Sequence, residues 1–498
     1  MKHTQYYSAL AFAIVAYALL VMHSEYLYAL QDNSIFISGH TFMQEMLNRK
    51  QGLWIWVGSY LTQFFYYPWL GALMLTLVWV ATHLSLTVAL RPKGYWHIVP
   101  LLSVTLQLYA VMTFGYYLYY SKCPGYAFAM AMCILAMSVM VMVVRIVMDR
   151  FTKVKALYTN IALAICCIIY IVANPVVRLY SWTYPSKTFF SELKMYHAMD
   201  ECRWDDVINE NVKADKPTNF MVMMKNIALM HTDKLGDMLK TNNCGTLYDA
   251  PDSLQVRTSR IGAPMIYYQF GQFNFAYRWA IENSVEYGMS IRHLKILIRA
   301  AMYNQELDLA QKYINILKST KFHRDWAIQK EREIHSSTLF YQSEECGNVA
   351  PLIVDDDVDL DNDNSNCLEW IIRYFSSIEK PKNDKQQNVA ICFSLVAKDG
   401  YRFATHFIDY VRTHPQASVP HLYQEAAIMF GSMPDEALDV SGFDFDNIIA
   451  ERYNNFVREF YDLKEQKLSD EEMASKLKPL YGETYWWYYY FYSDLVLY

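Results

Sequence analysis

The sequence predicts an all-α protein with an N-terminal bundle of transmembrane helices followed by a solenoid of helical hairpins. Apolar segments of membrane-spanning length gather before residue 180, and beyond it the apolar residues follow helical periodicity with little strand-like alternation. Residues 1–180 carry a net charge of +7, whereas residues 181–498 carry −13. We therefore expect a transmembrane domain over 1–180 and an extracytoplasmic helical-repeat domain over 181–498.

Five segments are long and apolar enough to cross a bilayer, whose core of ~30 Å requires about 20 apolar residues in a helix. The first segment is too long for a signal peptide and lacks a small-residue cleavage site, so we expect a retained anchor. The predicted spans are roughly Tyr7–Tyr28, Pro68–Leu90, Ile98–Tyr120, Gly125–Met148 and Ala156–Arg178.

The stretch between the first two spans requires a separate interpretation. Pro68 suits the first turn of a helix, where its missing N–H costs nothing, so the second span is expected to begin there. Residues 53–67 then form a short helix in the membrane interface. We expect its large aromatic residues to face acyl chains: Trp54, Trp56, Phe64 and Phe65. The alternative is a sixth, short or re-entrant span.

Orientation follows from the basic residues of the loops. Arg91 and Lys93 lie between the second and third spans, and four more basic residues lie between the fourth and fifth, at Arg145, Arg150, Lys153 and Lys155. The positive-inside rule places these loops in the cytoplasm with the N-terminus. Five spans then deliver everything after Arg178 to the other side of the membrane.

Aromatic residues gather at the outer ends of these spans. They include "FFYYPW" (Phe64–Trp69) and "GYYLYY" (Gly115–Tyr120). Tyr and Trp favour this depth because one end of the side chain is apolar and the other meets water. An aromatic belt is the simpler interpretation, and a lipid or glycan platform is the alternative.

A short pattern recurs in the second half of the chain. Phe273-x-Phe275-Ala276-x-x-Trp279 is similar to Leu307-x-Leu309-Ala310-x-x-Tyr313, at an offset of 34 residues. Related copies begin at Tyr401 and, more weakly, at Trp204. A small residue between large apolar ones lets one helix pack closely on its neighbour. Over roughly residues 189–415 the chain therefore resembles tetratricopeptide-type repeat proteins, which implies an α-helical solenoid.

The whole chain also resembles an uncharacterised family of Bacteroidota membrane proteins. The similarity lies in "LTQFFYYPWLGALML", in "VPHLYQEAAIMF" and in "GETYWWYYYFY" near the end. The resemblance implies an inner-membrane protein with a periplasmic helical domain. It implies no activity and no catalytic residues.

Near its end the chain carries eight consecutive aromatic residues, Tyr485–Tyr492. Before them, Ser469 has the position of a helix N-cap, with acidic residues in the first turn. The aromatic run is expected to form a last helix that is apolar all round and must therefore be covered. Packing at the end of the solenoid is the favoured cover, and the membrane portion is the alternative.

Signatures of cofactor or metal chemistry are missing from the sequence, and no cofactor is expected. It contains no HExxH, GxSxG, Gly-rich phosphate loop or CxxC pair. The acidic run around Asp359, Asp361 and Asp363 has the early spacing of a calcium loop, but Asn364 and Trp370 stand where glycine and glutamate are needed. We therefore interpret it as a solvated loop, with weak calcium binding as the alternative. We expect His231, His293 and His323 to be surface or core residues.

Cysteine usage leaves the redox question open. Cys133, Cys166 and Cys167 lie within predicted spans and are expected to serve in packing. Five more are predicted outside the cytoplasm, where disulfides form, but an odd number leaves at least one without a partner in the domain. They are Cys202, Cys244, Cys346, Cys367 and Cys392.

Two acidic residues are the one enzymatic lead. Glu25 and Asp32 follow the first span on its outer side, a position that looks like the acidic site of multi-spanning transferases that use lipid-linked sugars. There a carboxylate acts as a general base or holds a metal. Those enzymes have more spans and a paired-acid spacing that this chain lacks, so the ordinary interpretation is acids at a loop entrance.

The leading hypothesis is a non-enzymatic envelope protein, anchored in the lipid bilayer of the inner membrane, whose helical surface binds a periplasmic or envelope protein partner or a peptide. The alternative is a membrane glycosyl- or lipid-transferase. A transporter is disfavoured, because the predicted spans hold few polar groups beyond His83, Gln107 and Asn160. The acidic second half offers no basic patch for a nucleic acid.

Overall fold

The structure of the protein is a computed structural model that describes most of the chain. It describes residues 2–49, 51–92, 94–113, 125–151, 187–214, 217–240, 258–353, 367–415, 418–433, 438–440 and 442–492. Within these residues every regular element is helical, which confirms the all-α prediction. The predicted fifth span, the acidic run and Cys123, Cys166, Cys167 and Cys244 lie outside the described residues.

The chain divides into two compact units. Unit 1 comprises residues 1–193, 281–299 and 306–332, and unit 2 comprises residues 194–280, 300–305 and 333–498. Unit 1 thus combines the apolar N-terminal part of the sequence with segments from the charged half. The boundary predicted at residue 180 falls outside the described residues and stays a prediction.

The described elements of the N-terminal part are α-helices and two 3₁₀ helices. They are α1 (Lys2–Met22), α2 (Ser24–Asp32), α3 (His40–Leu47), α4 (Gly52–Thr62), η1 (Gln63–Tyr66), α5 (Pro68–Leu90), η2 (Gly94–His97), α6 (Ile98–Met112) and α8 (Tyr126–Phe151).

Three of these helices are long and apolar enough to cross a membrane. They are Gln5–Met22 in α1, Pro68–Leu90 in α5 and Tyr126–Val147 in α8, and they fit the prediction of a membrane protein. The described part of the third predicted span is the shorter apolar helix α6. The second span begins at Pro68 as expected, because Tyr67 before it is extended and the proline occupies the first turn.

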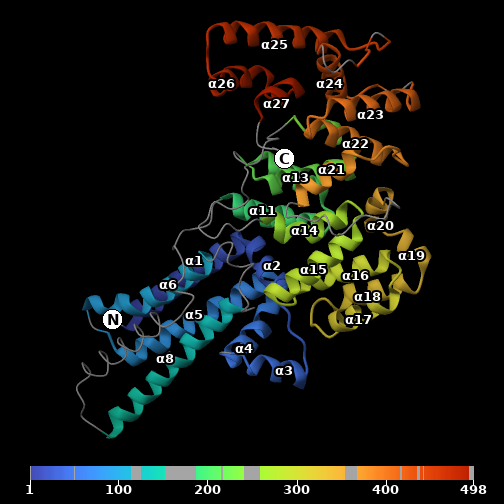
Figure 1. The fold of residues 1–498 in the computed structure, drawn as a ribbon. Coiled ribbons are helices and arrows are strands. Elements are labelled where there is room, and N and C mark those ends of the chain that lie inside the picture. The colour runs from blue at the N-terminus through green and yellow to red at the C-terminus, as the bar shows by residue number, and fades with distance from the viewer. Residues whose placement is uncertain are drawn as a thin grey trace. The chain divides into compact units, whose positions relative to one another are not determined.

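The four apolar helices alternate in direction. Helix α5 packs against α1, α6 and α8, which Figure 1 shows side by side within unit 1. At one end the Tyr26 hydroxyl, just after α1, donates to the Val111 carbonyl near the end of α6 and lies 2.5 Å from the Tyr126 hydroxyl at the start of α8. At the other end Gln5 bonds to Thr87 and His97. The chain therefore passes up and down the bundle in sequence order.

The helix before Pro68 exists, but its aromatic residues do not all point outward. Phe65 is completely buried, with its ring 5.1 Å from Phe128 in α8, so the expectation that it faces acyl chains is wrong. The cause is a close approach between α4 and α8. A Cβ atom on Gly58 would lie 2.5 Å from the carbonyl oxygen of Gly125, whose φ of +75° favours glycine. This contact places Phe65, three residues beyond the end of α4, against α8.

The remaining helices follow in the charged half of the sequence. They are α11 (Lys187–Asp200), α12 (Trp204–Val212), α13 (Asn219–His231), η3 (Leu235–Asp237), α14 (Thr258–Gln269), α15 (Phe273–Tyr287), α16 (Ile291–Tyr303), α17 (Leu307–Lys318), α18 (Arg324–Ile334), α19 (Ser337–Tyr341), α20 (Glu344–Val349), η4 (Ala350–Leu352), α21 (Cys367–Ser376), α22 (Asp384–Val396), α23 (Gly400–Thr413), α24 (His421–Gly431), α25 (Asn447–Glu465), α26 (Asp470–Tyr481) and α27 (Tyr485–Phe491).

Each copy of the short repeat pattern lies at the start of a helix. Phe273, Leu307 and Trp204 are the first residues of α15, α17 and α12, and Tyr401 is the second residue of α23. A left-handed residue ends the helix before each copy. At Lys398, for example, the Asp399 N–H bonds back to the Ser394 carbonyl in the pattern of a Schellman turn. The sequence pattern thus marks tight helix–turn–helix connections.

The aromatic run forms α27, which is covered within unit 2. Tyr485 and Trp486 are fully buried against Phe430 in α24 and Phe456 in α25. Helix α27 also packs on α26, and Figure 1 shows α24–α27 together in orange and red. Before it, Ser469 forms the expected N-cap, as a complete capping box with Glu472.

Helices α22 and α27 also cap each other. The hydroxyls of Tyr485 and Tyr488 donate to the carbonyls of Leu395 and Val396 at the end of α22, each at 3.1 Å. In return, the Lys398 ammonium donates to two carbonyls at the end of α27, those of Tyr489 at 2.7 Å and Tyr492 at 2.5 Å. The Leu395 carbonyl also accepts from the backbone N–H of Lys398 at 3.1 Å, so these side-chain contacts add to the backbone hydrogen bonds at the helix ends.

Candidate functional site

A polar pocket in unit 2 is the strongest candidate site. It has a volume of about 160 Å³ and lies where η3 packs against α13, α22 and α24. An apolar cavity of about 150 Å³ holds one benzene molecule, so this pocket accepts a group the size of one side chain. Its polar lining comes from Asp233, Lys385, Asn388, Tyr410 and Tyr423, and its apolar walls are Met230, Leu235, Val389 and Pro420.

Lys385, in the first turn of α22, is the pocket's cation, and a hydrogen-bonded chain holds it in place. Its Nζ donates to His231 Nδ1 at 3.5 Å and to the Asn348 carbonyl at 3.3 Å. His231 Nε2 in turn donates to Gln269 Oε1 at 2.9 Å. Burial, together with the neighbouring Lys385 charge, lowers the pKa of His231 to about 3. The imidazole is therefore neutral and accepts from the lysine.

The rest of the pocket's polar lining is formed by a tyrosine pair and the amide of Asn388. The Tyr423 hydroxyl donates to Asn388 Oδ1 at 3.0 Å and lies 3.6 Å from the Cys392 sulfur. Burial raises the pKa of Cys392 to about 12, so this thiol stays protonated. The Tyr410 ring meets Tyr423 edge-on at 5.5 Å. These contacts turn the amide N–H groups of Asn388 away from Tyr423.

Asp233 lies at the rim of the same pocket. It has a left-handed backbone with φ of +55° in the turn that joins α13 to η3, and its side chain is exposed. Its charge opposes the lowering of the Lys385 pKa that burial causes. The pocket therefore combines a held ammonium group, amide and hydroxyl donors, and one carboxylate at its mouth.

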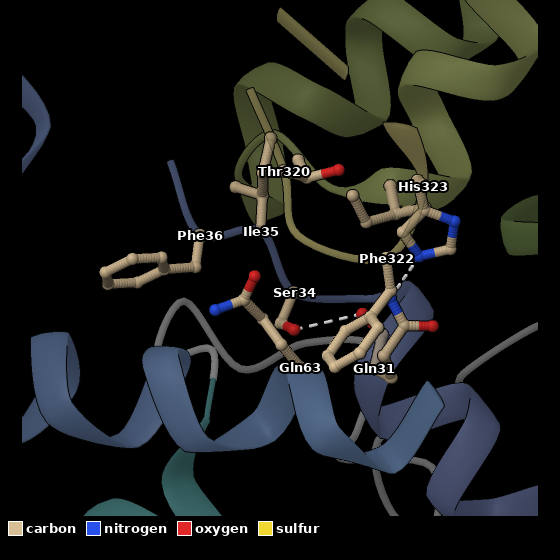
Figure 2. Close-up of a pocket in the computed structure, with 9 residues that line it drawn as sticks. Gln31, Ser34, Ile35, Phe36, Gln63, Thr320, Phe322 and His323 are labelled. Carbon is tan, nitrogen blue, oxygen red and sulfur yellow. Dashed lines mark hydrogen bonds between the residues drawn. The ribbon is translucent and has the colours of Figure 1, made fainter. Parts of the chain in front are cut away.

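A second, much smaller pocket lies in unit 1, between α2 and the loop that joins α17 to α18 (Figure 2). Gln31 Nε2 donates to His323 Nε2 at 2.5 Å, and the Ser34 hydroxyl donates to the Gln31 carbonyl at 2.9 Å. The space left is about 10 Å³, enough for roughly one water molecule. This is a polar packing contact and has no room for a substrate.

Next to that contact, Phe322 packs into a cage of aromatic side chains. Its ring stacks on Tyr66 at 5.4 Å with an interplanar angle of 7° and meets Phe64 and Tyr67 edge-on at 5.6 and 5.7 Å. The Lys321 ammonium lies 4.5 Å from the centre of the Phe64 ring. Part of the "FFYYPW" stretch is thus covered by protein within unit 1.

The predicted acidic residues Glu25 and Asp32 lie on α2. Being seven residues apart, they share one helix face about 10 Å apart. Glu25 Oε1 is 3.2 Å from His23 Nδ1, and the His23 ring stacks on Phe190 at 4.1 Å. Within the described part of the chain, no three His, Cys, Asp or Glu side chains come together to hold a metal ion. The transferase alternative therefore stays a prediction.

The other candidate residues have structural surroundings. His293 and His323 are buried, at 5% and 6% exposure, and His231 belongs to the pocket chain. The five cysteines within the described residues, Cys133, Cys202, Cys346, Cys367 and Cys392, are unbridged. Sequence reasoning missed the pocket itself. Its only local signal was the polar run "NDKQQN" at the start of α22, which also suits an ordinary helix N-terminus.

These observations define an α-helical protein with helices able to span a membrane and a polar pocket in a second unit. Comparison with family models matches residues 2–152 and 126–492 to a family of unknown function, DUF6057. The chain belongs to this family. Searches of curated proteins and of solved structures find no match.

Proposed function

We propose that this chain is a multi-spanning protein of the bacterial inner membrane whose extracytoplasmic helices bind a protein or peptide. Membership of an uncharacterised family is compatible with this function but assigns none. The sequence resemblance to Bacteroidota membrane proteins supports the location. The polar pocket around Lys385 carries the binding proposal, because its donors are held in position and its volume suits a single side chain.

The direction of the chain through unit 1 supports a multi-span topology. Tyr26 contacts both Tyr126, at the start of α8, and Phe189 in α11, with ring centroids 6.3 Å apart in the second pair. Residue 189 therefore lies at the same end of the bundle as residue 126, whereas α8, 26 residues long, ends about 39 Å away. This placement supports an odd number of membrane crossings before residue 189. Basic residues lie at the opposite end of the bundle, which the positive-inside rule assigns to the cytoplasm, so the C-terminal half would be periplasmic.

Helical hairpins are the scaffold of the proposed binding surface. Tight turns before the repeat-pattern helices, and the packing of α22 on α23, support a tetratricopeptide-like arrangement in which successive hairpins present a shared face. The pocket lies among such helices. A partner segment would insert one side chain there while its backbone follows the neighbouring helices.

Site-specific photo-crosslinking in intact cells tests this function. A photoreactive amino acid replaces Pro420, a half-buried apolar residue of the pocket lining, or, as a control, Tyr401, which is 81% exposed on α23 in the same unit. We expect a discrete crosslinked polypeptide from position 420 and none of the same mass from position 401. Equal adducts from both positions, or lipid adducts alone at 420, would refute binding of a protein at the pocket.

The topology is tested with reporters fused after Tyr498. Alkaline phosphatase, which is active only outside the cytoplasm, is expected to be active in this fusion, and a fluorescent protein that matures only in the cytoplasm is expected to be dark. The reverse pair of results would place the pocket in the cytoplasm and exclude a periplasmic partner.

A further inference from the structure

The arrangement of donors in the unit 2 pocket indicates which chemical group it takes. We propose that the pocket binds a carboxylate, supplied by an acidic side chain or the C-terminus of the partner polypeptide. This inference rests on the proposed binding function and names the group that the site recognises.

Lys385 and Asn388 present unused donors from adjacent positions of one helix. An ammonium group has three N–H donors, and two of those on Lys385 point to His231 Nδ1 and the Asn348 carbonyl. Asn388 lies three residues later on α22, so both side chains occupy the same helix face. Its Oδ1 accepts from Tyr423, which leaves the two amide N–H groups. These make no hydrogen bond to other described residues.

Tyr410 adds a hydroxyl to the same pocket. This hydroxyl forms no hydrogen bond within the described residues, although its ring is held between Tyr423 and His414, at 5.5 and 4.6 Å. The pocket thus offers one charged donor, two amide donors and one hydroxyl. A carboxylate has about four acceptor sites on two oxygens, which matches this set in number and in charge.

The charges of Lys385 and Asp233 disfavour a phosphate or a cation as the ligand and favour a single carboxylate. Lys385 is the one cation among the pocket's lining residues, and the exposed Asp233 carboxylate stands at the rim. A dianionic phosphate would face the repulsion of Asp233 with one cation to offset it, and a cationic group would meet Lys385 inside. A single carboxylate balances Lys385, and the peptide N–H groups next to it can donate to Asp233.

The pocket is also organised before any ligand arrives. The neutral His231, fixed by Gln269 and lying 4.6 Å from the Trp204 ring, holds the lysine ammonium without competing for its charge. Little side-chain freedom then remains to be lost when a carboxylate binds, which favours affinity. Leu235 and Pro420 add apolar surface beside these polar groups, which suits the aliphatic part of an acidic side chain.

The test uses full-length protein in detergent and an array of short peptides. Each peptide is made with an internal Asp or Glu and with the matching Asn or Gln, and with a free or an amidated C-terminus. N-acetyl-aspartate and N-acetyl-asparagine form the small-molecule arm, measured by calorimetry. We expect a subset of peptides to bind only in a carboxylate version, with the amide version weakened about 10- to 100-fold.

Substitutions in the pocket test whether its donors cause the preference for carboxylate over amide peptides. Lys385→Met removes the positive charge of the pocket. Asn388→Asp keeps the acceptor for Tyr423 and replaces the amide donors by a negative charge. Each variant is expected to lower the affinity for carboxylate peptides about 10- to 100-fold. Lys385→Arg is expected to retain binding. The matched controls are Lys476→Met and Asn454→Asp at exposed positions of α26 and α25, and neither is expected to change affinity.

The outcomes separate this inference from the proposed function. If peptides bind equally well as carboxylates and amides, or if Asn388→Asp binds as wild type does, the carboxylate inference is overturned while peptide binding stands. If N-acetyl-aspartate binds and no peptide does, the pocket recognises a small acid, and the peptide function fails. If neither arm binds, both are overturned.

Discussion

Glu425 in α24 gives the most quantitative test of how unit 2 is held together. Its side chain is 8% exposed, and its Oε2 accepts a hydrogen bond of 2.9 Å from the backbone N–H of Tyr485, the first residue of α27. Burial raises the pKa of Glu425 from 4.5 to about 7. The hydrogen bond from Tyr485 and the charges of Arg452 and Lys240 oppose this rise. The carboxyl is thus protonated more readily in the folded protein than in the unfolded chain.

The sign of the pH effect follows from proton binding. Between about pH 4.5 and pH 7 the folded state binds more protons at Glu425 than the unfolded state does, so the free energy of unfolding falls as the pH rises through this window. The difference between the two pKa values corresponds to about 3 kcal/mol. Glu425→Gln keeps an oxygen acceptor for Tyr485 and removes the titration. It should therefore stabilise the protein by up to about 3 kcal/mol at pH 8 and change little at pH 4.5.

Thermal unfolding of the full chain in detergent, followed at pH 4.5, 6, 7 and 8, measures this effect. The Tm of Glu425→Gln relative to wild type should rise across the series by about 6–12 °C. Glu451→Gln, at an exposed position of α25, is the control and should follow wild type at every pH. A constant difference between Glu425→Gln and wild type over the whole series would refute the argument that burial of this carboxyl is costly.

Three further substitutions test individual contacts. Gly58→Ala forces a Cβ atom to within 2.5 Å of the Gly125 carbonyl and should cost about 1–3 kcal/mol in detergent unfolding, whereas Gly39→Ala, with nothing within 4 Å, should be neutral. Lys398→Met removes the ammonium group from the end of α27, and urea titration should show a loss of about 1–3 kcal/mol. Phe322→Ala empties the aromatic cage and should lower the free energy of unfolding by about 2–4 kcal/mol in thermal unfolding. Trypsin should also cleave the α17–α18 loop earlier, and unchanged cleavage would contradict the claim that the cage holds this loop in place.

Local features of the fold could be predicted from the sequence because neighbouring residues determine them. Pro68 fixes the start of α5 through its own backbone geometry, and Ser469 caps α26 with Glu472, three residues later. The repeat pattern located the starts of α12, α15 and α17 for the same reason, since close helix packing after a tight turn needs a small residue between large ones.

Contacts between distant segments could not be predicted in this way. Hydrophobic periodicity shows that a residue faces something apolar, but not whether that is lipid or another helix. The pattern therefore predicts that Phe65 faces acyl chains, although it packs on Phe128. The pocket poses the same difficulty, because Lys385 and Tyr423 are separated by 38 positions and are brought together only by the folding of α22 and α24.

The mutual capping of α22 and α27 has a consequence for biosynthesis. Tyr485 and Tyr488 leave the ribosome 90 and 92 positions after Leu395 and Val396, to whose carbonyls they donate. At a translation rate of about 5–20 residues per second, the Leu395 and Val396 carbonyls and the apolar surface of α24 remain uncovered by α27 for several seconds. The packing of α27 on α22 and α24 can therefore form only after α27 has been translated, and until then the nascent chain is a natural client for chaperones that shield aromatic and aliphatic surfaces.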